Sequence, residues 1–248
     1  MKTWESAGLV FTLALACAAI AWFVLKRRAR EKGSVLQAEI ERCTTLGRRL
    51  QDLLVGKQLT LGMTPEKTPD RDKLLAGYWA LIVDYHEGML GLMNQKLYSS
   101  AFALLRPTME ALIRAHVVLF KPQSIVDDII ADKYQTDFRT VGTEIDSAFN
   151  YKLPGAAEGL FEHFLKDKNV LHSFTHSGMP QVGRRFNGAD LEVNFEDEEV
   201  INFAHISTCA LALVTILLTN QYGFKAEAKE ADRLFVEWGG TGAASAAP

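Results

Sequence analysis

Apolar residues recur along most of the chain at spacings of three and four, the period of an α-helix with one buried face. This pattern predicts helices over residues 70–94, 98–120, 124–150, 196–224 and 225–238. A shorter helix is expected after Pro154. Alternation of apolar and polar residues, the period of a strand, is almost absent. We therefore expect an all-α fold, a bundle of five or six helices with two nearly apolar helices at its centre.

The most apolar stretch lies near the start of the chain. Residues 8–25 contain no charged side chain, and the basic sequence KRRAR follows at once. A helix of this length spans roughly 27 Å, so the segment predicts one transmembrane anchor. The basic flank places the body on the cytoplasmic side. Cleavage or lipid attachment at Cys17 is the alternative, but the apolar run continues beyond Cys17 and no positive bias precedes it.

A second stretch, ALALVTILL within residues 196–224, is apolar enough to suggest a membrane span. Asn202 and His205 shorten its uninterrupted apolar part to about 13 residues, which is below the length that a span needs. We therefore expect this segment to be a core helix of the bundle.

Residues 34–55 predict an amphipathic helix beside the anchor. Its apolar positions form one seam, at Leu36, Ile40, Cys43, Leu46, Leu50 and Leu53. Two interpretations are open: a homodimer paired through this seam, or a helix folded back on the body. The following loop is rich in Pro and Gly, as domain boundaries often are.

The pattern divides the chain into four parts. These are an anchor, a basic amphipathic helix with its linker, a cytoplasmic helical bundle and a disordered tail, over residues 1–25, 26–68, 69–238 and 239–248.

Charge is distributed unevenly along the 248 residues, although the formal net charge is only −3. Residues 26–49 carry a net charge of +5, whereas residues 50–248 carry −8. A basic collar beside an acidic body suits an anionic membrane surface, and it makes nucleic acid a poor partner. Three scattered cysteines favour a reducing compartment. The sequence contains neither a glycine-rich phosphate loop nor a nucleophile-elbow motif.

Charged residues interrupt the otherwise apolar helix over residues 98–120. Arg106, Glu110 and Arg114 follow one another at intervals of four, so they share a helix face and Glu110 can pair with either arginine. Charged side chains on a helix that is otherwise buried must be paired or must line a cleft. The stripe therefore predicts either a binding site or an ion pair that fixes helix register.

A second group of candidate residues lies downstream, in LHSFTHSG. His172 and His176 stand four apart and share a face, and Arg184 with Arg185 follows soon after. If this segment meets the stripe, the arginines could bind a small anion. Glu110, His172 or His176 could then act in proton transfer. A purely structural role, capping and cross-linking a loop, is equally open.

The remaining histidines offer less. A zinc or iron site would need His172 and His176 together with His86 or Glu110, but the pair lacks the glutamate of HExxH, so we expect neither a metal nor another cofactor. His86, between Asp84 and Glu87, is expected to pair with these carboxylates in solvent. The other histidines are expected to be structural, at His116, His163 and His205.

The segments ALLRPTMEALIRAHVVLF and LHSFTHSGMPQVGRR together resemble an uncharacterised group of bacterial helical proteins, over about residues 70–222. That group combines a Leu-Leu-Arg-Pro-x-x-Glu helix with a downstream His-x-x-x-His segment and a basic pair. The resemblance carries over the pattern residues Arg106, Pro107, Glu110, His172, His176 and Arg185. It also implies a distant relation to HEPN ribonucleases of phage defence. A bacterial chain with the apolar segment at residues 8–25 is expected in the inner membrane. The Arg-to-His spacing of those nucleases is absent.

Three functions follow from these patterns. The first is a membrane-anchored sensor or effector of defence or stress, which binds a small anionic ligand such as a nucleotide. The second is a hydrolase that uses His176 and Glu110, and the third is a structural partner in a membrane complex.

Overall fold

A computed structural model describes residues 33–55, 57, 69–149, 159–166, 186–187, 190–191 and 195–245. The predicted all-α bundle is confirmed for this part of the chain. The predicted anchor at residues 8–25 lies outside the described residues.

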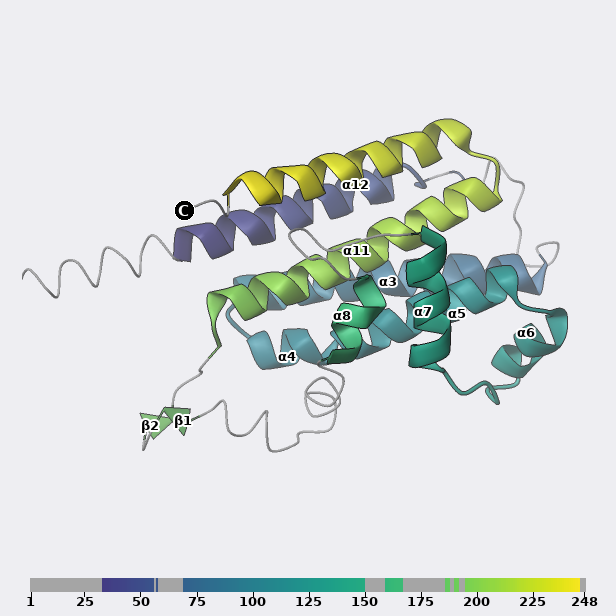
Figure 1. The fold of residues 1–248 in the computed structure, drawn as a ribbon, viewed down its shortest axis with the longest axis horizontal. Helices are drawn as coiled ribbons and strands as arrows, with labels where there is room; N and C mark the ends of the chain where they lie inside the picture. The colour runs from purple at the N-terminus through teal and green to yellow at the C-terminus, as the bar shows by residue number, and fades with distance from the viewer. Residues whose placement is uncertain are drawn as a thin grey trace, which may run out of the picture.

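Helices make up almost all of the described structure (Figure 1). The first, over residues 33–52, is called here the leading helix. The others are α3 (Asp70–Asn94), α4 (Tyr98–Ala103), α5 (Leu105–Phe120), α6 (Gln123–Ile130), α7 (Phe138–Phe149), α8 (Leu160–Lys166), α11 (Asp197–Gln221) and α12 (Lys225–Ser245). The strands β1 (Phe186–Asn187) and β2 (Asp190–Leu191) form a small antiparallel hairpin.

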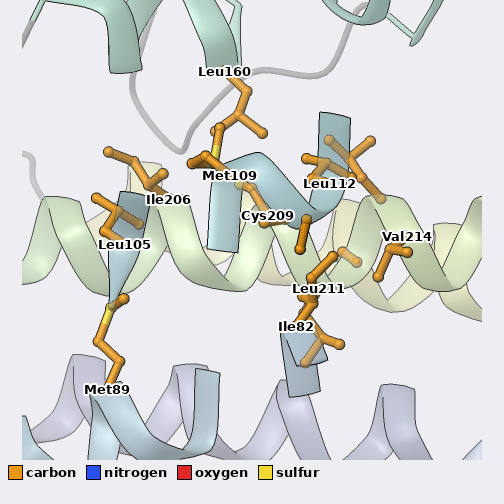
Figure 2. Packing of buried hydrophobic residues seen from close by; sticks show 14 of the residues in the cluster. Ile82, Met89, Leu105, Met109, Leu112, Leu160, Ile206, Cys209, Leu211 and Val214 are labelled. Atoms are coloured by element: carbon orange, nitrogen blue, oxygen red, sulfur yellow. The ribbon is translucent and has the colours of Figure 1, made fainter. Parts of the chain in front are cut away.

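Helix α11 is the centre of the bundle. It contacts α3, α5, α8 and α12, and nearly every residue from Phe203 to Thr219 is buried. Figure 2 shows its side chains packed with those of α3, α5 and α8. Among the described helices, α11 alone has the length and apolarity to cross a membrane, and 89% of its most apolar stretch is buried in the bundle. These observations agree with the predicted core helix.

The leading helix packs its apolar seam onto the body of its own chain. Five of the six seam residues predicted from the sequence are buried in the common core, and Leu54 replaces Leu53 as the sixth. In Figure 1 this helix (purple) runs beside α12 (yellow). The folded-back arrangement therefore accounts for the seam, and part of the range 26–68 belongs to the core of the bundle. Pairing of two chains remains a prediction.

One predicted helix, over residues 124–150, is wrong: it is divided into α6 and α7. Helix α6 ends where Asp132 adopts a left-handed conformation, with φ of 54°. The backbone N–H of Lys133 then donates to the carbonyl of Asp128, which closes the helix end. Helix α7 starts afresh because the side chain of Asp137 accepts hydrogen bonds from the backbone of Arg139 and Thr140.

The helix predicted over residues 98–120 is interrupted at Leu104, between α4 and α5. Pro107 has no N–H to donate to the carbonyl of Ala103, and its ring crowds that carbonyl. The break therefore lies one turn before the proline.

The last helix is longer than predicted. We expected a disordered tail from Gly239 onward, but α12 continues to Ser245. Local propensity does not explain this extension, because Gly239, Gly240 and Gly242 disfavour a helix more than Ala243 and Ala244 favour it. The turn before α12 depends on Gly223, whose φ of 73° suits glycine best.

Candidate functional site

The structure places the predicted stripe of α5 against the connection between α6 and α7. One oxygen of Glu110 accepts hydrogen bonds from Arg114 (3.0 Å) and Thr136 (3.0 Å). The guanidinium of Arg114 also lies over the ring of Tyr134, at 5.9 Å from its centroid. Arg106 lies over the ring of Phe138, also at 5.9 Å. The pairing of Glu110 with Arg114 is as predicted.

These contacts support the structural interpretation of the stripe. Glu110 and Arg114 hold the segment that leads into α7, and the side chain of Glu110 is 34% exposed. The other predicted site residues, His172, His176, Arg184 and Arg185, lie outside the described residues. Contact between the stripe on α5 and the histidine segment therefore remains a prediction.

A more buried polar cluster, not predicted from the sequence, lies beneath the leading helix. Nε2 of His205, on α11, lies 3.1 Å from Oε2 of Glu39. The other carboxylate oxygen of Glu39 accepts a hydrogen bond from Arg42, which also donates to the backbone carbonyl of Trp238 at 2.7 Å. Glu39 and His205 are only 8% and 7% exposed. The cluster thus ties the leading helix to both α11 and α12.

The charges of this cluster balance. Burial raises the pKa of Glu39, but hydrogen bonds from Arg42 and His205 outweigh that effect, so the pKa lies below its usual value. Burial lowers the pKa of His205, although Glu39 opposes this shift. A neutral His205 that donates its Nε2–H to an ionised Glu39 satisfies both directions. Arg42 then supplies the positive charge.

His86 occupies a second buried polar position, on α3. We expected it in solvent with Asp84 and Glu87, and this prediction is wrong: His86 is 1% exposed. Its Nδ1 lies 3.1 Å from Oγ of Ser207 on α11. Burial lowers the pKa of His86 to about 4, an effect that the backbone of Cys43 partly opposes, so the imidazole is neutral near pH 7.

A polar cavity of about 250 Å³ lies between the leading helix and α3. The cavity residues are Thr44, Arg48, Gln51, His86, Glu87, Leu90, Gly91 and Asn94. Two amide contacts connect the helices that enclose it: Gln51 donates to Glu87 at 2.9 Å, and Gln37 donates to Asn94 at 3.1 Å. The cavity therefore brings an arginine, a glutamate and a histidine together.

A larger groove of about 430 Å³ lies on the other flank of the leading helix, against α12. Its charged lining residues are Glu41, Arg42, Arg49 and Glu237. Arg42 is held by the buried cluster, and Arg49 lies 3.6 Å from Glu230. These arginines already have partners, so the groove is a weaker candidate for anion binding than the cavity.

The described part of the chain holds two buried cysteines and no cluster of metal-binding side chains. Burial raises the pKa of Cys43 to about 12, and it also raises the pKa of Cys209, so both thiols are protonated at neutral pH. Among the described residues, no three His, Cys, Asp or Glu side chains lie close enough together to hold a metal ion.

Comparison with known families assigns the chain to a family whose function is unknown. A family of unknown function, DUF6988, matches residues 79–237, which is more than half of the chain. The chain belongs to this family. The match agrees with the expected uncharacterised group, although it gives no support for a relation to HEPN ribonucleases or phage defence. No curated protein matches the chain, and no solved structure does.

The matched region of DUF6988 begins within α3 and ends within α12, so the leading helix lies outside it. The family domain supplies His86 and His205, whereas Glu39, Arg42 and Arg48 come from the leading helix. Both the buried cluster and the cavity thus form where a segment outside the family match packs onto the family domain.

Part of this arrangement had a signal in the sequence. His86 continues the buried spacing of Ile82, Met89 and Met93, which indicates a core position more strongly than its charged neighbours indicate solvent. Glu39 stands beside Ile40 within the apolar seam. No sequence signal indicates which of these buried polar side chains meet.

Proposed function

We propose that this chain is a single-pass membrane-anchored sensor or effector module. Its helical body binds a small ligand with an anionic group, and the leading helix passes the effect of binding to the anchor. The observation that carries this proposal is the buried pair of Glu39 and His205, which fixes the leading helix in the body.

A passive tether would need only a flexible linker between membrane and body. Here the predicted anchor ends at Leu25, and the docked leading helix begins at residue 33. The seven residues between them reach at most about 25 Å. A helix docked so close to the anchor, by buried charged groups as well as apolar ones, favours mechanical coupling over simple attachment.

The ligand part of the proposal rests on polar groups that the fold brings together beside the leading helix. Arg48 and His86 face one cavity from two helices, so a bound anion would bridge the leading helix to α3. A ligand that binds across two helices stabilises their docked arrangement by its binding free energy. This is the physical route by which binding could reach the anchor.

Two measurements on the full chain test the proposal. The protein should stay in the membrane fraction after alkaline carbonate extraction. Amide hydrogen exchange of the leading helix, in detergent or proteoliposomes, should be as slow as that of α11. A Glu39→Gln variant should accelerate exchange in the leading helix more than in α11, and Glu41→Gln, at an exposed neighbouring position, is the matched control.

Extraction of the wild-type chain by carbonate would overturn the membrane anchor. Exchange in the leading helix as fast as in an unfolded segment would overturn the coupling, because a helix that is not docked cannot transmit binding.

A further inference from the structure

The cavity between the leading helix and α3 holds an imidazole with unused hydrogen-bonding capacity. Nδ1 of His86 bonds to Ser207. Its Nε2 faces the leading helix at Gly47 and makes no hydrogen bond of good geometry among the described residues, although the backbone of Cys43 lies close enough to raise the pKa of the ring. A buried polar nitrogen without a partner costs free energy comparable to a lost hydrogen bond. The imidazole lines the cavity, so a bound polar molecule is a natural source of the missing partner.

The rim of the cavity carries one charge of each sign. Arg48 is exposed on the leading helix, and within the described part of the chain it makes no hydrogen bond or ion pair. Glu87 is exposed on α3 and accepts one hydrogen bond, from Gln51 at 2.9 Å. A carboxylate has room for several further donors, so Glu87 can still receive another group.

We propose that this cavity binds a small amino-carboxylic acid, the chemistry of an α-amino acid. The ligand carboxylate pairs with Arg48, and its ammonium group pairs with Glu87. The imidazole of His86 gives the third contact. A purely anionic ligand would meet the carboxylate of Glu87, whereas a zwitterion matches both charges.

The size of the cavity agrees with a small ligand. Its volume of about 250 Å³ is below the range of about 300–1,000 Å³ that is typical of sites for drug-sized molecules. This inference rests on the proposed function for its role, because it names the ligand that the module would sense. The binding site itself does not depend on the membrane anchor.

Titration calorimetry and thermal unfolding of the full chain in detergent micelles test the site. The probes are the common L-amino acids, each compared with the carboxylic acid that lacks the amino group and with the amine that lacks the carboxylate. At least one amino acid should bind and raise the unfolding temperature, and both of its truncated analogues should bind at least about tenfold more weakly.

Variants at the exposed rim distinguish this site from general binding. Arg48→Gln and Glu87→Gln should each weaken binding at least about tenfold, because each removes one charge partner of the ligand. Arg49→Gln is the matched control: it changes the next residue of the same helix, which faces α12 instead. It should leave affinity unchanged.

Absence of binding by every amino acid at 10 mM would overturn the proposal, and so would equal losses in the Arg48 and Arg49 variants. A carboxylic acid that binds as tightly as its amino acid would overturn the role of Glu87. If the chain bound no amino acid but still resisted carbonate extraction, the ligand proposal would fail and the membrane anchor would stand. The two proposals can therefore fail separately.

Discussion

Nε2 of His205 and Oε2 of Glu39 lie 3.1 Å apart although the residues are separated by 166 positions in the sequence. Glu39 belongs to the leading helix and His205 to the central helix α11. Their contact, with the hydrogen bond from Arg42, is the buried polar connection between a segment outside the family match and the core of the family domain.

Replacement of Glu39 by Gln should destabilise the protein clearly. The change leaves Arg42, whose side chain is 27% exposed, without its carboxylate partner, and a hydrogen bond to a charged group is worth about 1.5–3 kcal/mol. Thermal or denaturant unfolding of the full chain in detergent measures the change. Glu41→Gln should be nearly neutral, since Glu41 is exposed. Equal stability of the two variants would contradict the role of the buried cluster.

Stability should fall as the pH decreases from about 6.5 to about 4. Burial lowers the pKa of His86 to about 4, below the ordinary value of 6.5. The unfolded chain therefore binds a proton at a higher pH than the folded chain does. This favours unfolding by up to about 1.4 kcal/mol per pH unit for one histidine. Unfolding temperatures measured across this range should show the trend.

Other buried groups contribute in the same pH range, so a variant is needed to identify the share of His86. His116 also has a pKa lowered to about 4 by burial, and the pKa of His205 is lowered as well. His86→Gln should reduce the pH dependence relative to wild type. If the slope were unchanged in this variant, a titrating His86 would be ruled out as a contributor.

Glycine at position 47 should be essential to the packing of the leading helix. A Cβ there would lie 2.6 Å from Nε2 of His86, which is too close for any real contact. Gly47→Ala should cost about 1–3 kcal/mol despite the better helix propensity of alanine. Gly77→Ala, on α3 with nothing within 4 Å, is the control and should gain about 0.5–1 kcal/mol. A stabilising Gly47→Ala would contradict the close approach of His86.

Neutralisation of Glu110 should have a modest effect. Its ion pair with Arg114 is partly exposed, at 34% and 19% of the two side chains, so Glu110→Gln should cost about 1 kcal/mol or less. Hydrogen exchange at Thr136 and its neighbours should speed up modestly, since a neutral amide oxygen is a weaker acceptor for the Thr136 hydroxyl than a carboxylate oxygen. A large gain in stability instead would indicate a strained site of the kind that function maintains.

The periodicity of apolar residues determined the helical fold by itself. Helix formation depends on local spacing, so the extents of α3, α11 and the leading helix followed closely from the sequence. Local chemistry also explained the break at Leu104, because Pro107 cannot donate a hydrogen bond to the preceding turn of the helix. The end of α6 escaped prediction, since nothing in the periodicity requires Asp132 to adopt a left-handed conformation.

Only the tertiary structure decided which polar groups meet. The contact of Glu110 with Arg114 was predictable because both lie on one helix, one turn apart. The contacts of Glu39 with His205 and of His86 with Ser207 join different helices, and they depend on how those helices rotate and cross in the bundle. Helical spacing fixes the face on which a side chain lies, whereas the packing of the whole core selects its partner.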